Sequence, residues 1–287
     1  MTATVQYDAL APAETGRSHR IAARVRRVVA PNPSAMTGPG TNTYLLGAEE
    51  CLVIDPGPDE PTHIDRIIEL ANGRVAGILC THSHTDHSPG AARLKALTGA
   101  TVYGLPAPDD EFQDESYAPD AGLTEGQAFS VGEDVLSVVH TPGHASNHVC
   151  FLLKSSGLLF TGDHLMSGST VVILPPDGSM LQYLQSLRRL QTMPAASIAP
   201  GHGAVIPDAQ SEIDRVIAHR LKREEKLVAA LSARATATLD DVLPEVYDDV
   251  PVFMHPVARY SLLAHMIKLV EERRVEARES TAYRWLG

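Results

Sequence analysis

The sequence predicts an α/β fold followed by a helical C-terminal region. Two consecutive segments, 51–71 and 75–97, each read as a short apolar strand, a polar turn and a helix with apolar residues three or four apart. After Asp208 the apolar residues recur mainly with helical spacing. We therefore predict a main domain over residues 1–207 and a helical domain over residues 208–287, sizes that two hydrophobic cores can support.

The N-terminal half alternates strands and helices. The first twenty or so residues lack an apolar period and are expected to form a loose arm. Strands are predicted at 21–30, 43–47, 51–54 and 75–80, and helices at 61–71 and 91–97. The Pro- and Gly-rich segment 31–42 is predicted to be a loop large enough to border a pocket.

The second half adds more strands and then a helical tail. The segment 105–126 is rich in Pro and acidic residues and is expected to form a surface insertion. Strands are predicted at 135–140, 148–153, 158–160 and 197–199, with an amphipathic helix at 180–192. Three helices after Asp208 and a hairpin at 274–285 have the outline of a winged helix.

Composition excludes several classes of protein. Hydrophobic residues make up 44% and charged residues 21%, as in soluble globular chains. The start of the chain lacks the basic and apolar stretches of a signal peptide and no run reaches transmembrane length, so a cytoplasmic protein without a membrane partner is expected. The three cysteines lack a CxxC pair, which speaks against a disulfide framework or a cysteine zinc finger. A net charge of −11 argues against a broad phosphate-binding surface.

The segment Thr81–His87, THSHTDH, carries the first strong signal of chemistry. Three imidazoles and a carboxylate follow an apolar strand directly, which is too many polar groups to bury without a common partner. Side chains alternate along an extended segment, so His82 and His84 point to the same side and can reach one metal ion. Asp86 and His87, on the turn into the next helix, can face a second ion.

More residues of the kind that bind metals end later strand-like runs. They are His144 in HTPGH, Asp163 in FTGD and His202 in PGHG, and each lies beside a glycine. Loops at strand ends converge in space, glycine permits close backbone approach, and a carboxylate between two cations can bridge them. The four motifs together predict a two-metal site.

These motifs resemble those of the metallo-β-lactamase superfamily. THSHTDH is similar to its HxHxDH signature, and TPGH, TGDH and PGHG are similar to its later ligand motifs, in the same order, over roughly residues 20 to 207. The resemblance implies a four-layer αβ/βα sandwich. GTNTYLLG, VIDPG and the helical tail further resemble the branch that contains a lactamase-like endoribonuclease, whose members carry a C-terminal winged-helix-like domain, and the tail 208–287 fits that description.

The resemblance also implies roles for individual residues. His82, His84 and His144 would hold one metal, Asp86, His87 and His202 the other, and Asp163 would bridge them. The zinc β-lactamases lack such a bridging aspartate, so the resemblance favours glyoxalase II-like thioesterases and RNA-cleaving members over antibiotic hydrolysis. Asp86 would orient the nucleophile. His148 has two interpretations. It is a second catalytic group, which donates a hydrogen bond or carries a proton behind the ligands, or it is a histidine packed at the start of a strand.

The chemistry expected of such a site is hydrolysis. A water held between two divalent cations loses its proton near neutral pH, against a bulk pKa of about 15.7, and the resulting hydroxide attacks a carbonyl carbon or a phosphorus. Imidazole-rich ligands favour zinc, and manganese or iron also suits a site with carboxylates.

Several functions fit this site. The first is a binuclear metallohydrolase that acts on a small ester, thioester or amide-like substrate. The alternatives are a single-strand endoribonuclease, an iron-dependent oxygenase, and a binding protein with a degenerate metal site. A homodimer is compatible with the sequence.

Overall fold

The computed structural model describes Asp8, residues 11–278 and residues 282–287, and it divides into two compact units. Unit 1 holds the described residues up to Thr141, Asn147–Thr170 and Pro194–Gln210. Unit 2 holds Pro142–Ser146, Val171–Met193 and the described residues from Ser211 onward. Much of the predicted N-terminal arm lies outside the described residues. The predicted domain boundary after residue 207 stays a prediction.

Unit 1 contains two mixed β-sheets. The first comprises β1 (Ser18–Ala22), β2 (Val25–Val29), β3 (Asn42–Leu46), β4 (Cys51–Ile54), β5 (Val75–Leu79), β6 (Thr101–Gly104) and β7 (Ala121–Gly122), in that spatial order. The second follows the spatial order β12 (Ser197–Pro200), β11 (Leu158–Gly162), β10 (Val149–Leu153), β9 (Asp134–His140) and β8 (Ala128–Val131). Strand β4 pairs with β5, and β11 with β12, in the parallel sense. The carboxyl ends of the strands in each parallel pair therefore lie at the same edge of their sheet.

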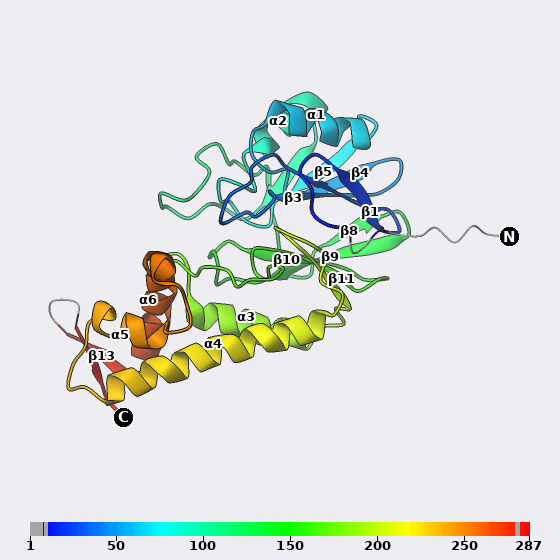
Figure 1. Cartoon of the computed structure of the whole chain (residues 1–287). Coiled ribbons are helices and arrows are strands. Elements are labelled where there is room, and N and C mark those ends of the chain that lie inside the picture. The colour runs from blue at the N-terminus through cyan, green and yellow to red at the C-terminus, as the bar shows by residue number, and fades with distance from the viewer. Residues whose placement is uncertain (1–7, 9–10, 279–281) are drawn as a thin grey trace. The chain divides into compact units, whose positions relative to one another are not determined.

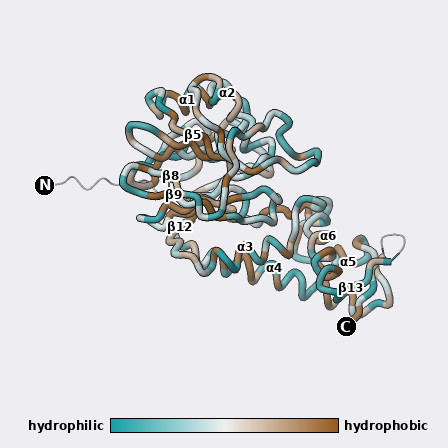
Figure 2. Tube along the Cα trace, turned by 180° about the vertical axis from the view of Figure 1, so that it is seen from behind, coloured by the Kyte–Doolittle hydropathy of each residue, from teal (hydrophilic) through white to brown (hydrophobic). Residues whose placement is uncertain are grey.

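The two sheets share one core, and helices cover the outer face of the first sheet. Helices α1 (Pro61–Leu70) and α2 (Gly90–Thr98) lie together on that face (Figure 1). The alternation of side chains along β3 shows the arrangement: Tyr44 and Leu46 pack in the core shared with the second sheet, whereas Leu45 packs beneath the helices. Figure 2 shows hydrophobic residues, in brown, concentrated on the strands of unit 1, around the labelled β5, β9 and β12.

Unit 2 is mainly helical. It contains α3 (Met180–Gln191), most of α4 (Ala209–Ser232), α5 (Leu239–Val246), the short 3₁₀ helix η1 (Val252–Met254), α6 (His255–Glu271) and the hairpin of β13 (Val275–Ala277) and β14 (Tyr283–Trp285). A capping box starts α5, in which Thr238 and Asp241 satisfy each other's backbone N–H groups. Residues of α4, α5, α6 and the hairpin form a separate core, in agreement with the predicted winged-helix outline.

Two predictions about unit 1 were wrong in detail. The single strand expected at 21–30 is a hairpin of β1 and β2, because Arg24 adopts a left-handed backbone conformation with φ 73° and turns the chain. The segment 105–126 is not only a surface insertion, since Gln113 and Asp114 within it are buried.

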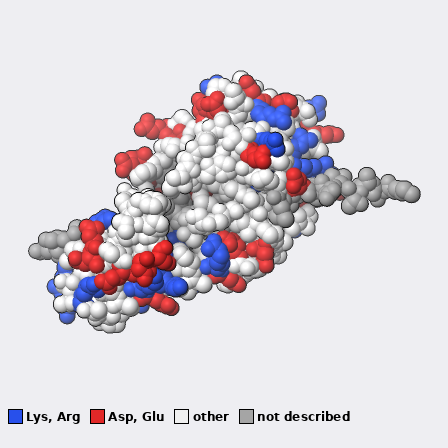
Figure 3. Space-filling model, viewed as in Figure 1, with Lys and Arg blue, Asp and Glu red and all other residues white. Residues whose placement is uncertain are grey.

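The distribution of charge on the surface agrees with the composition. On the face in Figure 3, basic and acidic side chains are interspersed and no continuous basic area is visible. None of the helices among the described residues combines the length and the hydropathy needed to cross a bilayer.

Candidate metal centre

The predicted site residues of unit 1 lie in loops that directly follow strands. The loop with His82 to His87 follows β5, Asp163 follows β11, and His202 follows β12. Parallel pairing brings such strand ends to one edge of each sheet, and the shared core sets the two sheets face to face. Residues more than a hundred positions apart in the sequence therefore meet.

One group of potential ligands lies entirely within unit 1. It consists of Asp86, His87, Asp163 and His202, whose ligand atoms all lie within 4.8 Å of one another. Oδ1 of Asp163 lies 3.3 Å from Nε2 of His87 and 3.3 Å from Nε2 of His202. Oδ2 of Asp86 lies 3.1 Å from Nε2 of His202 and 3.6 Å from Nε2 of His87. Two carboxylates and two imidazoles at these separations can hold a divalent cation.

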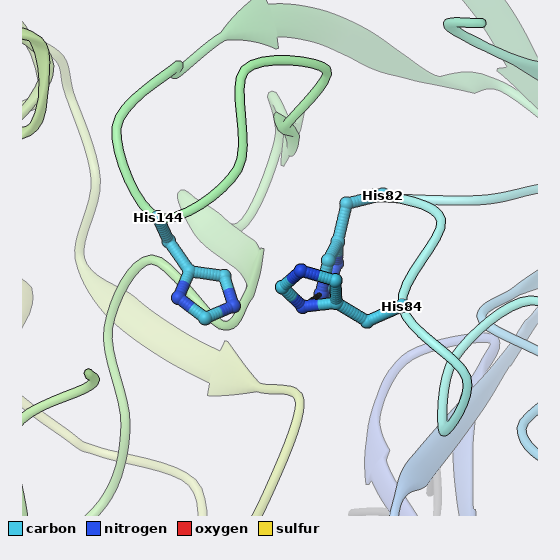
Figure 4. Close-up of side chains that lie close together, drawn as sticks. All are labelled: His82, His84 and His144. Atoms are coloured by element: carbon cyan, nitrogen blue, oxygen red, sulfur yellow. Dashed lines mark hydrogen bonds between the residues drawn. The ribbon is translucent and has the colours of Figure 1, made fainter. Parts of the chain in front are cut away.

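A second group is formed by His82, His84 and His144, whose ring nitrogens also lie within 4.8 Å of one another. Nε2 of His82 lies 3.0 Å from Nδ1 of His84. His144 stands on the short loop between Thr141 and Asn147, which belongs to unit 2, and Figure 4 labels the three side chains. Three imidazoles are a donor set that suits a divalent cation.

Oxygen atoms outside the two groups orient the imidazoles. The pairs are Nδ1 of His82 with Thr81 Oγ1 at 2.9 Å, Nδ1 of His87 with Asp55 Oδ2 at 3.0 Å, and Nδ1 of His202 with the Gly40 carbonyl at 3.3 Å. A carbonyl or carboxylate oxygen only accepts, and Thr81 already donates its hydroxyl proton to Asp55. Nδ1 therefore carries the proton in each ring, which leaves Nε2 as the ligand atom on the side of the cluster.

The structure supplies a direct test of whether a cation fits. Nε2 of His87 is buried and has no hydrogen-bond partner among the described residues, although Oδ1 of Asp163 lies 3.3 Å from it. Burial alone would lower the pKa of His202, but Asp163 outweighs it and raises that pKa to about 9. In His87 the carboxylates of Asp86 and Asp163 likewise outweigh burial and raise the pKa well above its usual value. The cluster thus favours positive charge, which a metal ion would supply.

A glycine permits this close approach. A Cβ atom at Gly201 would lie 2.6 Å from Oδ1 of Asp163 and 2.7 Å from Cε1 of His87. Real Cβ atoms do not approach other atoms this closely, so the position requires glycine. The carbonyl of Gly201 also accepts from the Asn42 backbone N–H at 2.7 Å, which fixes the loop that carries His202.

His148 lies behind the cluster. Its side chain is fully buried, its ring centroid is 5.1 Å from that of His82, and its Nδ1 lies 2.9 Å from the Thr141 hydroxyl. These contacts place it against the back of a candidate ligand.

Sequence reasoning missed two residues that support the cluster. Asp55 accepts hydrogen bonds from the Thr81 backbone and hydroxyl and also contacts His87, so it ties the end of β4 to the histidine loop. Gln113 accepts from the Ser83 hydroxyl, inside the THSHTDH motif. The position of Asp55 directly after an apolar run was a usable signal, whereas nothing in the sequence around Gln113 indicated its role.

Comparison with known proteins identifies the family. Residues 36–202, more than half of the chain, match the metallo-β-lactamase superfamily. The chain belongs to this superfamily. Residues 238–285 match the β-lactamase-associated winged helix domain, so the predicted α/β sandwich with a C-terminal winged helix is confirmed.

Relatives of this superfamily member extend over most of its length. A β-lactamase-like protein 2 homolog of Drosophila melanogaster is 32% identical over 290 residues, covering 95% of each chain. An atrochrysone carboxyl ACP thioesterase of Aspergillus fumigatus is 35% identical over 216 residues, 72% of this chain and 65% of the relative. A metallo-β-lactamase family protein of Thermus thermophilus shares the fold, with a TM-score of 0.75 and 23% identity over 92% of this chain and 99% of that one.

Proposed function

We propose that the chain is a two-metal hydrolase that cleaves a small carbonyl substrate, with a thioester or ester as the preferred class. One metal would be held by His82, His84 and His144, and the other by Asp86, His87 and His202. Asp163 would bridge the two. In this proposal the catalytic domain spans 1–207 and the winged-helix-like domain spans 208–287.

The observation that carries the proposal is the orientation of the histidines. Each of His82, His87 and His202 has its Nδ1 held by an oxygen outside the cluster, so each ring directs Nε2 inward. Histidine ligands of metal sites are oriented in this way, because the outer hydrogen bond sets the tautomer and the ring angle. A cluster of histidines that served only packing would not need this arrangement in all three of these rings.

The chemistry divides between the metals and the protein. A pair of divalent cations, when bound, would polarise the substrate carbonyl and lower the pKa of water from 15.7 to about 7. Asp86, whose side chain is 28% exposed, is the acidic residue of the cluster that is open to solvent, so it can accept a hydrogen bond from the attacking water and orient it. His148, packed behind His82, would act through that ring and not on the substrate directly.

The substrate class rests on two supports. Asp163 supplies a carboxylate of the kind that the zinc β-lactamases lack, and its Oδ1 lies 3.3 Å from Nε2 of both His87 and His202. A relative that is 35% identical over 216 residues is named a thioesterase of an acyl carrier protein. Zinc is the proposed metal because imidazole nitrogens dominate the donor set, and manganese or iron is the alternative.

The test combines metal analysis with a substrate panel. Elemental mass spectrometry should find close to two zinc or manganese ions per chain, with fewer in His84→Ala and Asp163→Ala. The metal-loaded protein should hydrolyse members of a panel of thioesters and esters. A single iron per chain would instead indicate an oxygenase, and a protein that takes up no metal would end the proposal.

The same panel should include a labelled single-stranded RNA oligonucleotide. The protein would act on a phosphodiester and not on a carbonyl compound if two results were obtained. It would cleave the RNA, with the cleavage lost in His84→Ala, and it would be inactive toward every thioester and ester.

A further inference from the structure

The ring of His144 is oriented by the backbone of another segment of the same unit, unit 2. Its Nδ1 lies 2.9 Å from the carbonyl oxygen of Val172. Because a carbonyl only accepts, Nδ1 is the protonated nitrogen and the lone pair resides on Nε2. The direction in which His144 presents Nε2 therefore depends on where the short segment Val171–Ile173 is held.

Two side chains from the C-terminal helices hold this segment. Arg220 of α4 donates from Nη2 to the carbonyl of Val171, and Ser261 of α6 accepts from the backbone N–H of Ile173 at 3.3 Å. Arg220 is only 3% exposed, and its guanidinium lies 5.4 Å from the centroid of the Tyr183 ring. The segment is thus fixed on both sides of the carbonyl that contacts His144.

Arg220 is an unusual residue to bury at this position. Among the described residues, no carboxylate lies within ion-pair distance of it, so the cost of burying its charge is offset mainly by hydrogen bonding and by stacking on the tyrosine. An apolar side chain would fill the same space without a desolvation cost. What the arginine supplies in addition is a fixed position for the Val171 carbonyl.

Other residues of unit 2 hold the backbone around His144 as well. The carbonyl of Gly143 accepts from the Ser179 N–H at 2.8 Å, and the Ser186 hydroxyl donates to the carbonyl of Pro142 at 2.8 Å. Gly143 adopts a φ of +143°, and a Cβ atom there would lie 2.3 Å from the Cα of Tyr183. Helix α3 therefore packs directly on this loop, and every partner named belongs to unit 2.

We propose that Arg220 and Ser261 of the C-terminal helices are positioning residues, which set the direction of His144 through the segment Val171–Ile173 of the same unit. The inference rests on the proposed metal-binding role of His144 and adds to it a structural reason for the helical extension. Outer hydrogen bonds to metal ligands typically govern affinity by about 10- to 100-fold. Loss of this support should therefore weaken one metal site and leave the other unchanged.

The test compares two buried arginines of the same helix in the full-length chain. Arg220→Met removes the contact with Val171. Arg223→Met is the matched control, because Arg223 is also buried, donates to a backbone carbonyl, that of Val246, and lies over a tyrosine, Tyr247, at 4.2 Å. Arg223→Met also loses an ion pair with Asp249, 2.6 Å from Nη1, so it is at least as disruptive as Arg220→Met, and only Arg220→Met loses the path to His144.

The measurement is a titration of metal-free protein with Zn²⁺ against a chromophoric chelator, which gives the number of sites and each Kd. We expect Arg223→Met to bind two ions with the same two Kd values as wild type. Arg220→Met should bind one of the two ions about 10- to 100-fold more weakly than wild type does. Ser261→Ala should weaken the same site to a smaller degree. If Arg220→Met does not fold, the zinc affinity of Ser261→Ala tests the proposal in its place.

The outcomes separate this inference from the proposed function. Wild-type affinity at both sites in Arg220→Met and in Ser261→Ala would overturn the inference, as would an equal weakening in Arg223→Met. A wild-type chain that binds no Zn²⁺ would instead overturn the proposed function, and the positioning role with it.

Discussion

Replacing Asp55 by Asn tests the physical basis of the metal centre. The carboxylate accepts three hydrogen bonds, from the Thr81 N–H at 2.7 Å, the Thr81 hydroxyl at 2.8 Å and Nδ1 of His87 at 3.0 Å. An amide has one oxygen and one NH₂ group, so whichever way it is turned the NH₂ faces at least one of these donors. A buried donor left without an acceptor costs about 1–3 kcal/mol, and a hydrogen bond to a charged group contributes about 1.5–3 kcal/mol. We expect Asp55→Asn to lower the free energy of unfolding by roughly 3–5 kcal/mol, as for other broken buried pairs.

The assay is urea unfolding of the metal-free protein, combined with a Zn²⁺ titration. With a slope of about 1–3 kcal/mol per molar urea, the loss corresponds to a decrease of the midpoint by about 1 M or more. Zinc affinity should fall by about 10- to 100-fold because His87 loses the partner that fixes its tautomer. Asp59→Asn is the control, since Asp59 is a surface carboxylate paired with Arg93. If Asp55→Asn unfolds and binds zinc like this control, the argument about donors and acceptors is wrong.

Three further predictions concern stability, geometry and the loop of His202. Burial alone would raise the pKa of Glu224, but its hydrogen bonds, first that with His265, lower this pKa to about 2. The ionised carboxylate therefore stabilises the folded protein fully above about pH 4.5, and this stabilisation is lost as the pH falls toward 2. A Glu224→Gln variant should have a lower melting temperature than wild type at pH 7, and the difference should shrink below about pH 4.5 and be largely lost at about pH 2; a difference of unchanged size there would contradict the assignment. Gly201→Ala would place a Cβ atom 2.6 Å from Oδ1 of Asp163, so elemental analysis should show reduced metal content, and a full complement of metal would refute the steric argument. The Tyr44 hydroxyl donates to the carbonyl of Pro200 at 2.7 Å. Tyr44→Phe should therefore lower the free energy of unfolding in urea by about 1 kcal/mol. An unchanged midpoint would show that this bond contributes nothing.

The parts of the site that sequence could predict are those with local signals. His82, His84, Asp86 and His87 stand within six residues after an apolar strand, and period-two alternation alone puts the first two on one side. The later motifs were recognisable because each combines a metal-binding residue type with a glycine at the end of an apolar run. The structure brings these residues together as two groups with ligand atoms within 4.8 Å.

The parts that sequence could not predict depend on pairing between distant segments. Asp55 meets Thr81 only because β4 and β5 are parallel neighbours, and no local pattern encodes that register. Gln113 is buried because its segment pairs with His84, although the acidic residues around it read as a solvated loop. The break at Arg24 was missed since the turn there contains no Gly, Pro or Asn.

The wide separation of the candidate ligands in the sequence has a consequence for the order of folding. In unit 1 they extend from Asp86 to His202, and they come from loops after strands of both sheets. Closing such long loops costs conformational entropy that a cation could recover only once both sheets have formed. In the proposed two-metal hydrolase, capture of the cations would therefore be a late step, unlike in small zinc domains whose folding requires the ion. A shortage of metal would then leave a folded but inactive chain and not an unfolded one.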